Sequence, residues 1–202
     1  MQKIVNGYLQ FKESGFEERK DLFERLSNSQ SPEVLFITCS DSRIDPNLIT
    51  QTEPGELFVI RNAGNIVPPH TIESDGIVAS IEFAVVALDV KHIVVCGHSN
   101  CGAMKGALNT ADLTALPKVK SWLNYCSEAV TIVQSREADI KSDQLNSMTQ
   151  ENVLLQIRRL EKYPEISKRL ASGDIEIHGW VYEIGGGTIK CFNSRKQGFI
   201  EL

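Results

Sequence analysis

Apolar residues follow two different patterns along the chain. Short runs rich in Val, Ile and Phe occupy positions 34–38, 56–62 and 92–97, and turn residues bound them. Such runs predict buried strands. Between residues 3 and 28, apolar positions instead recur at helical spacing among charges, with a break near Gly15. The pattern therefore predicts an N-terminal pair of helices followed by strands that alternate with helices.

Three longer segments carry the helical pattern after the first strand. Residues 75–90 form an apolar stretch rich in Ala and Val, and residues 116–134 and 148–171 are amphipathic. Pro164 is expected to kink or split the last of these helices, and Gly173 is a suitable residue to end it. The helical segments thus connect or follow the predicted strands.

The C-terminal part has a different pattern. Residues 175–194 read as a strand, a "GGG" turn and a second strand, which predicts a β-hairpin. Alternating strands and helices favour a mostly parallel sheet with right-handed crossovers. The predicted fold is therefore α/β, with a central sheet flanked by helices. We expect one domain over residues 1–202 that includes an N-terminal helical arm, residues 1–30, and the C-terminal hairpin.

Composition narrows the class of partner. The 202 residues include 42% hydrophobic ones, enough for a core, and 26 acids against 21 bases give a net charge of -5. Proteins that bind nucleic acids depend on clustered Lys and Arg residues. The densest group of basic residues here, at 158–162, alternates with apolar residues, as on a solvated helix face. The sequence contains no run of 18 apolar residues, the length that would predict a membrane-spanning helix. Neither a nucleic acid nor a membrane is an expected partner.

Cysteine usage favours the cytoplasm. The five cysteines are an odd number without the spacing of a small disulfide scaffold, and the first 20 residues lack the signature of a secretory signal. Free thiols in a reducing compartment are the expectation. A free cytoplasmic location is therefore expected.

Two predicted strands end in metal-ligand residues. Cys39 closes the first strand in "CSDSR", and His98 and Cys101 follow a later strand in "GHSNCG". Because functional sites gather beyond the carboxyl ends of parallel strands, these residues are expected to converge. Two thiols and one imidazole, with a fourth position open, suit a catalytic zinc ion. The flanking Gly97 and Gly102 are expected to permit unusual backbone angles and close packing.

An Asp–Arg pair accompanies the first cysteine. Arg43 can hold the carboxylate of Asp41 in a two-pronged pair. Asp41 can then accept a hydrogen bond from a zinc-bound hydroxide, which aims the lone pair of the hydroxide at a substrate. Asp41 could instead ligate zinc directly and close the site, or the pair could be only structural. Two thiolates cancel the charge of the metal, so the pKa of bound water should exceed the roughly 7 of an all-His site.

Four motifs together resemble one family. "CSDSR" (39–43), "RNAGN" (61–65), "GHSNCGA" (97–103) and "HGWVY" (178–182) resemble the β-class carbonic anhydrases in order and spacing, over nearly the whole chain. The resemblance implies reversible hydration of CO2 to bicarbonate and a proton through zinc-bound hydroxide. It also implies one Zn2+ per chain, with Cys39, His98 and Cys101 as ligands and Asp41 and Arg43 as the catalytic dyad.

The same resemblance implies substrate contacts. Gln30 matches a glutamine near the substrate oxygen in plant-like, open-site members, and Phe58 and Ala63 should line the apolar pocket for CO2. The bicarbonate-inhibited subclass, which closes at low pH, typically carries Trp where Phe36 stands. The open subclass is therefore favoured, although Arg61 and Tyr182 match other bicarbonate contacts of the inhibited one.

The resemblance also bears on assembly. It implies a homodimer or a tetramer built from dimers, with N-terminal helices that reach across to a partner and with pocket residues shared between chains. Many members carry Tyr where Phe83 stands, so the role of that hydroxyl behind the site or in a dimer contact is missing here, without a necessary loss of catalysis. The resemblance also leaves a carbon-concentrating compartment as the alternative to a free cytoplasmic location.

Two alternative functions remain on sequence grounds. A hydrolase of CS2 or COS on the same fold would use the same ligands with a different pocket. A non-catalytic zinc-binding assembly protein would have no use for the Asp41–Arg43 pair, because structural zinc sites take four protein ligands.

The remaining histidines, His70, His92 and His178, lack a partner motif, and His178 is expected to fix the final strand rather than bind metal. The other cysteines are expected to be inert packing residues.

Overall fold

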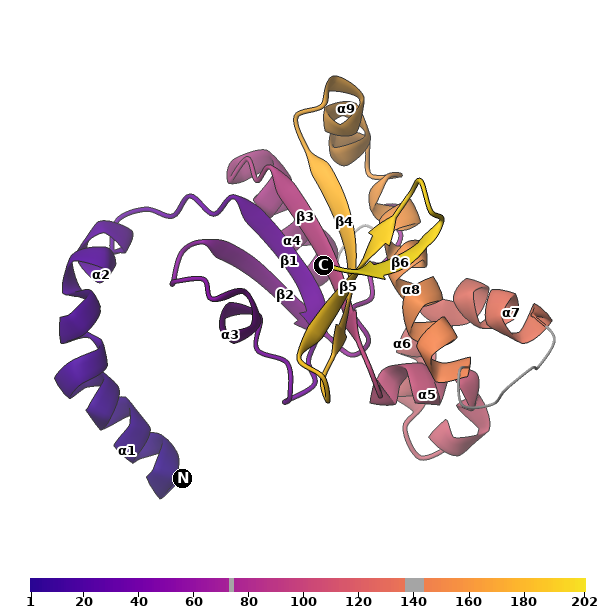
Figure 1. Cartoon of the computed structure of the whole chain (residues 1–202), viewed down its shortest axis with the longest axis horizontal. Coiled ribbons are helices and arrows are strands. Elements are labelled where there is room, and N and C mark those ends of the chain that lie inside the picture. The colour runs from indigo at the N-terminus through magenta and orange to yellow at the C-terminus, as the bar shows by residue number, and fades with distance from the viewer. Residues whose placement is uncertain (73–74, 137–143) are drawn as a thin grey trace. The chain divides into compact units, whose positions relative to one another are not determined.

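The computed structural model describes residues 1–72, 75–136 and 144–202 and divides into two compact units, Met1–Ser31 and Pro32–Leu202 (Figure 1). The boundary lies next to the predicted end of the helical arm. Each unit is therefore described by itself, and the interpretation of the whole chain as one domain stays a prediction.

The N-terminal unit consists of short helical segments. They are α1 (Gln2–Gln10), a π-helical turn η1 (Phe11–Gly15), a 3-10 turn η2 (Glu17–Arg19) and α2 (Lys20–Leu26). Phe16 and Phe23 stack with ring centroids 5.4 Å apart, and Phe11 meets Phe23 edge to face at 5.8 Å. The two predicted helices and the irregularity at Gly15 are confirmed.

The larger unit is built on a six-stranded sheet with the order β2-β1-β3-β4-β5-β6. Its strands are β1 (Val34–Cys39), β2 (Leu57–Asn62), β3 (His92–His98), β4 (Glu176–Glu183), β5 (Thr188–Asn193) and β6 (Gly198–Glu201). The first four are parallel, and β4, β5 and β6 pair antiparallel. The predicted α/β class, with a mostly parallel sheet and C-terminal antiparallel strands, is confirmed.

Helices occupy the connections between the parallel strands. They are α3 (Pro46–Thr50), α4 (Gly76–Glu82) with the π turn η3 (Phe83–Ala87), α5 (Gly102–Leu108), the 3-10 turn η4 (Thr110–Leu113), α6 (Pro117–Leu123), the 3-10 turn η5 (Asn124–Cys126), α7 (Ser127–Ser135), α8 (Gln144–Leu160) and α9 (Pro164–Ser172). The Asp75 carboxylate caps α4 by accepting the backbone N–H groups of Ile77 and Val78. None of these helices, within the described ranges, is long and apolar enough to cross a membrane.

Helix boundaries follow the proline and glycine signals. Pro164 begins α9, so the predicted helix over 148–171 is split rather than kinked. Gly173 ends α9 in the left-handed conformation with a φ of 77°, as predicted. The helix predicted over 116–134 is likewise two helices, because the η5 turn interrupts it. The short strand β6 was not predicted; the hairpin was expected to end at 194.

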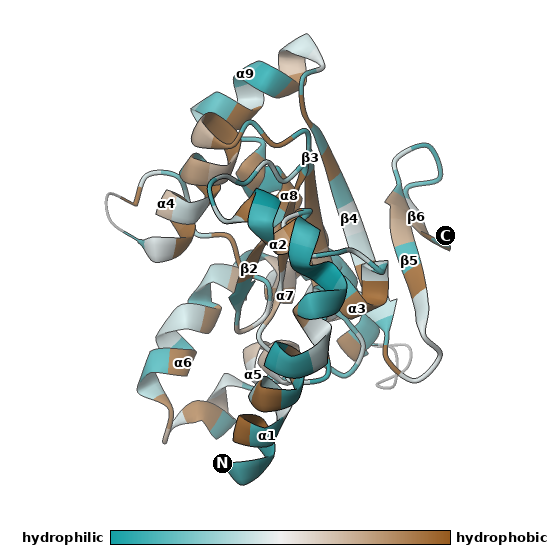
Figure 2. Ribbon diagram, turned by 90° about the vertical axis from the view of Figure 1, so that its left-hand side faces the viewer, coloured by the Kyte–Doolittle hydropathy of each residue, from teal (hydrophilic) through white to brown (hydrophobic). Residues whose placement is uncertain are grey.

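The core lies mainly on one face of the sheet. Alternate strand residues such as Leu35, Ile37 and Val95 pack there with buried residues of α4, α8 and α9. The opposite face carries a smaller cluster around Phe36, Val94 and Cys96. Burial on both faces explains why β1 and β3 are nearly continuous apolar runs, as the hydropathy colouring of β3 shows (Figure 2).

Candidate metal centre

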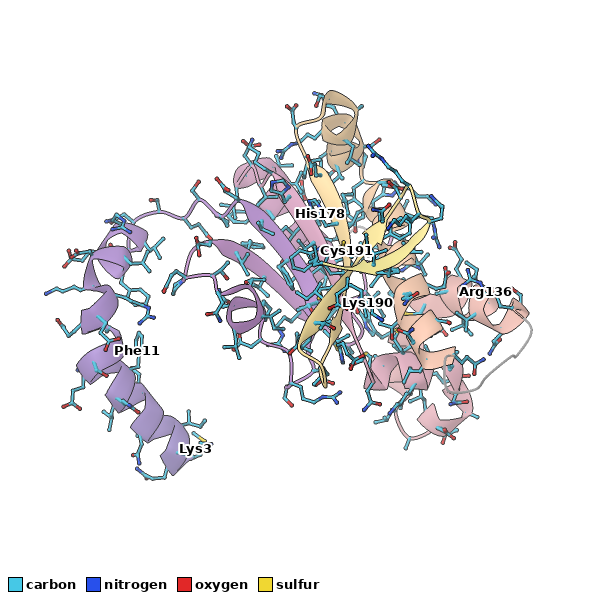
Figure 3. The ribbon with its side chains drawn as sticks, viewed as in Figure 1. Lys3, Phe11, Arg136, His178, Lys190 and Cys191 are labelled. Carbon is cyan, nitrogen blue, oxygen red and sulfur yellow. The ribbon has the colours of Figure 1, made fainter. Side chains whose placement is uncertain are left out.

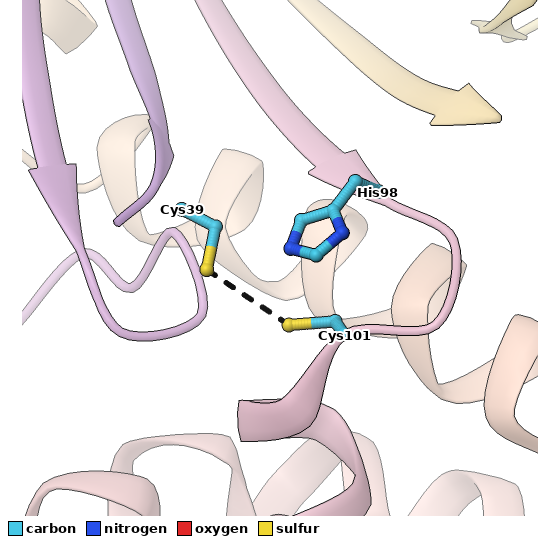
Figure 4. A group of neighbouring side chains, drawn as sticks. All are labelled: Cys39, His98 and Cys101. Atoms are coloured by element: carbon cyan, nitrogen blue, oxygen red, sulfur yellow. Dashed lines mark hydrogen bonds between the residues drawn. The ribbon is translucent and has the colours of Figure 1, made fainter. Parts of the chain in front are cut away.

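Three potential metal ligands meet beyond the carboxyl ends of two neighbouring strands (Figure 4). Cys39 is the last residue of β1, His98 is the last residue of β3, and Cys101 caps the start of α5. Their ligand atoms all lie within 4.8 Å of one another, and the two Sγ atoms are 4.0 Å apart. The side chains are at most 5% exposed. The structure therefore brings together the three residues that the motifs nominated as ligands.

The imidazole of His98 is oriented for metal binding. Its Nδ1–H donates a hydrogen bond to the carbonyl oxygen of Ser99 at 2.9 Å, which leaves the lone pair on Nε2. Nε2 is buried and has no hydrogen-bond partner among the residues that the structure describes. A buried polar atom without a partner costs about 1–3 kcal/mol. A metal ion held jointly with the two sulfurs would satisfy this atom, so the residues fit a zinc ion.

The two thiols have unequal acidity. The hydrogen bond from the thiol of Cys101, followed by that from the backbone N–H of Gly64, lowers the pKa of Cys39 to about 4 although burial opposes the shift. The hydrogen bond to Cys39, together with burial, raises the pKa of Cys101 far above its ordinary value. At neutral pH the metal-free pair therefore holds one proton. A zinc ion would displace that proton, because the thiolate is the ligand form.

The backbone at Gly64 is part of the same site. Its N–H lies 3.4 Å from the Cys39 sulfur, and its φ is +87°. A Cβ at this position would lie 2.8 Å from the Cε of Met104 and 3.1 Å from the Cβ of Ala103. A residue with a side chain would thus be strained twice over. The "RNAGN" motif needs this glycine to bring a backbone donor to the first cysteine.

The prediction for the flanking glycines is only partly right. A Cβ at Gly97 would lie 3.0 Å from side-chain carbons of both Thr149 and Val153, so close packing is confirmed there. At Gly102 no heavy atom of the described residues lies within 4 Å of that position. Neither has a positive φ. The prediction of unusual backbone angles is therefore wrong for Gly97 and Gly102. The glycine of the site that adopts the left-handed conformation is Gly64, whose N–H contacts the sulfur of Cys39.

Asp41 and Arg43 form the two-pronged pair. Arg43 donates from Nε to Asp41 Oδ1 at 2.8 Å and from Nη2 to Oδ2 at 2.7 Å, while its backbone N–H also reaches Oδ1 at 3.0 Å. These bonds hold the pKa of the Asp41 carboxyl well below its usual range. Asp41 Oδ2 lies 3.8 Å from Nε2 of His98. An ionised and fixed carboxylate therefore flanks the three potential ligands.

Arg61 has a positioning role that the sequence did not reveal. From β2, its Nε donates to the carbonyl oxygen of Cys39 at 3.1 Å and its Nη2 donates to that of Asp41 at 2.8 Å. Arg43 Nη2 also donates to the carbonyl of Asn100 at 3.2 Å, which links the two loops. The pairing of Cys39 with Asn62 in the sheet places "RNAGN" beside "CSDSR", and this register could not be read from either motif alone.

Of the three predicted substrate residues, two belong to the larger unit and one to the N-terminal unit. Ala63 directly follows β2, is exposed, and accepts a hydrogen bond from the Trp122 indole at 2.8 Å through its carbonyl. Phe58 pairs with Leu35 and lies four positions before Asn62, the last residue of β2. At the rise of a strand, Phe58 is therefore about 13 Å from the carboxyl end where Cys39 lies. Gln30 belongs to the N-terminal unit. A pocket shared between chains, which the resemblance implies, stays a prediction.

Comparisons with known proteins agree on one family. The family model described as carbonic anhydrase matches residues 34–189. The chain is 45% identical over 202 residues to a carbonic anhydrase of Synechocystis sp., covering 99% of this chain and 74% of that protein. It is 42% identical over 202 residues to a carbonic anhydrase of Pseudomonas aeruginosa, covering 100% of this chain and 92% of that one.

Solved structures give the same result. The β-carbonic anhydrase CcaA superimposes with a TM-score of 0.97 at 44% identity, covering 100% of this chain and 99% of that chain. A tetrameric β-carbonic anhydrase from Sordaria macrospora superimposes with a TM-score of 0.84 at 31% identity, covering 95% and 96%. The matched region contains the strand ends that carry Cys39, His98 and Cys101. The chain is therefore an enzyme of the carbonic anhydrase family and belongs to its β class.

Proposed function

We propose that the protein is a zinc-dependent carbonic anhydrase that catalyses the reversible hydration of CO2 to bicarbonate and a proton. One observation carries the proposal: the buried Cys39–His98–Cys101 cluster has an unpartnered imidazole nitrogen and lies beside an ionised Asp41. The names of the curated relatives support the same reaction.

Cys39, His98 and Cys101 would hold one zinc ion. Sulfur and nitrogen donors suit zinc rather than magnesium or calcium, which prefer oxygen ligands. When bound, zinc lowers the pKa of a water molecule and so supplies a nucleophile at neutral pH. Three protein ligands leave a fourth position, as catalytic zinc sites do, whereas structural sites take four protein ligands.

Asp41 would orient the attacking water. Its carboxylate stays ionised because Arg43 donates to both of its oxygens, so it acts only as a hydrogen-bond acceptor. A water O–H donated to Asp41 fixes the direction of the oxygen lone pair toward the carbon of CO2. Such positioning reduces the entropy lost on reaching the transition state. Arg61 contributes indirectly, because it holds the backbone carbonyls on which Cys39 and Asp41 depend.

The substrate residues are part of the proposal. Phe58 and Ala63 would line the apolar pocket for CO2, with the amide of Gln30 near a substrate oxygen, in a homodimer or in a tetramer of the kind named for the Sordaria macrospora relative. We favour the open subclass, and the intact Asp41–Arg43 pair supports it, since a carboxylate that ligated the metal would have to leave Arg43. A cytoplasmic location completes the proposal.

The first experiment is stopped-flow CO2 hydration by protein of known zinc content from about pH 6.5 to 9.5, a range that brackets the expected water pKa. Fast turnover with a simple rise in this range is expected. A steep collapse below about pH 8 would instead indicate closure of the site by Asp41. Zinc-loaded protein without hydration activity at any pH would overturn the proposal and direct attention to CS2 and COS.

The variant Asp41→Ala separates an enzyme from a zinc protein without catalysis. It removes the orienting carboxylate but none of Cys39, His98 and Cys101. We expect zinc content to stay at the wild-type value while turnover falls at least about tenfold, in line with lost positioning. Unchanged turnover would show that Asp41 does not act in the reaction.

A further inference from the structure

A second group of ligand-type side chains lies at the amino ends of β3 and β4. His92 is the first residue of β3, Glu176 is the first residue of β4, and the two are paired across the sheet. His178 lies two residues after Glu176 and pairs with Val94 (Figure 3). Because side chains alternate along a strand and paired residues share a face, all three project from the same face. His92 and His178, which have no partner motif in the sequence, therefore meet in the structure.

The distances within this group suit a single ion. His92 Nδ1 lies 3.2 Å from His178 Nε2, and Glu176 Oε2 lies 4.0 Å from the first of these nitrogens and 3.7 Å from the second. Two nitrogens on one tetrahedral zinc, each at about 2.0–2.1 Å, are about 3.3 Å apart. The imidazoles therefore already have the required separation, and the carboxylate needs only a small rotation to join them.

We propose that His92, Glu176 and His178 form a second metal site that binds a divalent ion of the zinc class. Two imidazoles and a carboxylate suit Zn2+, Co2+, Ni2+ and Cu2+, whereas a site for Mg2+ or Ca2+ would consist of oxygen ligands. The site is separate from the thiolate cluster. His92 and His98 stand at opposite ends of β3, about 20 Å apart at the rise of a strand.

The surroundings leave room for the rest of a coordination shell. The side chains of His92, Glu176 and His178 are 43%, 65% and 37% exposed, so water can reach the ion. The two histidines also line a cavity of about 350 Å³ together with Phe36 and Trp180. Burial, and then the charge of His92, lower the pKa of His178. Its ring is therefore neutral at pH 7, which is the form that binds metal.

A plain hydrogen bond between the imidazoles is the competing interpretation. One neutral ring would donate to the other across the same 3.2 Å, and Glu176 would then contribute little. The two interpretations differ in the role of the carboxylate. A metal site loses affinity when Glu176 loses its charge, whereas a hydrogen-bonded pair of rings binds no second ion in the first place.

The test is a titration of chelator-treated, full-length protein with Co2+. Cobalt bound to Cys39 and Cys101 gives thiolate-to-metal charge-transfer absorption, whereas cobalt bound by imidazole and carboxylate does not. We expect a first equivalent with this absorption and a second equivalent, seen by calorimetry and by metal analysis after gel filtration, without it. If charge-transfer absorption does not appear, the result contradicts the proposed zinc centre but not the second site. The second site is tested by the number of metal ions bound per chain.

Three variants assign the second equivalent. His92→Ala is expected to lose it, and Glu176→Gln to bind it at least about tenfold more weakly, a typical cost of disturbing a metal shell. His70→Ala is the matched control, because His70 is an exposed histidine outside the group, and it should bind as the wild type does. Far-ultraviolet circular dichroism checks that each variant is folded. A wild type that binds one equivalent only, or full binding by both His92→Ala and Glu176→Gln, would overturn the proposal.

Discussion

The two ends of β3 carry potential metal ligands that are held in opposite ways. At the carboxyl end, Cys39, His98 and Cys101 are at most 5% exposed. At the amino end, His92, Glu176 and His178 lie on the pleated sheet and keep more than a third of their side chains exposed. The first group comes from strand ends and a helix cap, and the second comes from positions within two adjacent strands.

The difference shows what burial adds to a metal site. Hydrogen bonds fix the carboxyl-end ligands: His98 donates to the carbonyl of Ser99, and Cys39 accepts from the backbone N–H of Gly64 and from the side chain of Arg61. A buried site of this kind strengthens the electrostatic interactions within it. The amino-end group is held by the register of β3 and β4 and by the contacts among its own side chains. It suits an ion that exchanges with solvent, and the predictions below test this contrast.

The largest effect is expected from Cys101→Ala. Removing one of three buried ligands leaves the other two unable to hold zinc, so we expect the loss of one zinc per chain and a fall in CO2 hydration of more than about 100-fold. Cys191→Ala is the control, since Cys191 is a partly exposed free cysteine on β5, outside the cluster (Figure 3). Hydration assays and metal analysis give the readout. Equal loss of activity in both variants would show a general effect of losing a thiol.

Gly64→Ala tests whether the carboxyl end is as rigid as its packing indicates. An alanine there must adopt a φ of +87° and must displace Met104. The strain of the backbone and the overpacking together should lower the free energy of unfolding by about 2–4 kcal/mol. Chemical denaturation measures this change.

Two controls place that loss at one end of the strand. Gly102→Ala, at the first residue of α5, adds a methyl where the described residues leave open space, so its effect should stay within about 0.5 kcal/mol. Glu176→Gln at the amino end should be equally mild, since its side chain is 65% exposed. A Gly64→Ala protein as stable as these two would mean that the turn relaxes without cost.

The carboxyl-end site was predictable because its residues are close in sequence. Asp41 and Arg43 follow Cys39 within four positions, and His98 and Cys101 are three apart, so each half is visible as a motif and only their meeting needs the sheet. The rule that sites lie at the carboxyl ends of parallel strands supplied that step. The alternation of apolar strands and helices likewise predicted the fold.

The amino-end group could not be found in this way. His92 and His178 are 86 positions apart, and they meet only because β3 and β4 pair with His92 opposite Glu176. A shift of this register by one residue would send one histidine to the other face. Register depends on packing across the whole sheet, so neither His92 nor Arg61, whose partners also lie on another strand, showed its role in the sequence.

Arg43→Lys should have a moderate effect. Lysine keeps the positive charge but cannot donate to both oxygens of Asp41 in a fixed geometry, so we expect hydration to fall about tenfold with zinc retained. The hydrogen bonds of Arg43 are the main reason that the pKa of Asp41 is lowered. That pKa should rise in the variant, and an NMR titration of the Asp41 carboxyl measures the rise. Arg195→Lys, an exposed substitution on the hairpin side of the sheet, should change neither.

The smallest effect is a difference in proton release between the two ends of β3. At pH 7 the thiol of Cys39 is already ionised, with a pKa of about 4, whereas Cys101 holds its proton. Zinc binding at the carboxyl end should therefore release about one proton, because both sulfurs become thiolates. Binding at the amino end should release no proton from His178, since the lowered pKa of that histidine leaves its ring neutral. Calorimetric titration in two buffers of different ionisation enthalpy measures both counts, with Glu176→Gln used to isolate the first. Release of two protons at the carboxyl end would show that Cys39 is a neutral thiol before the metal arrives.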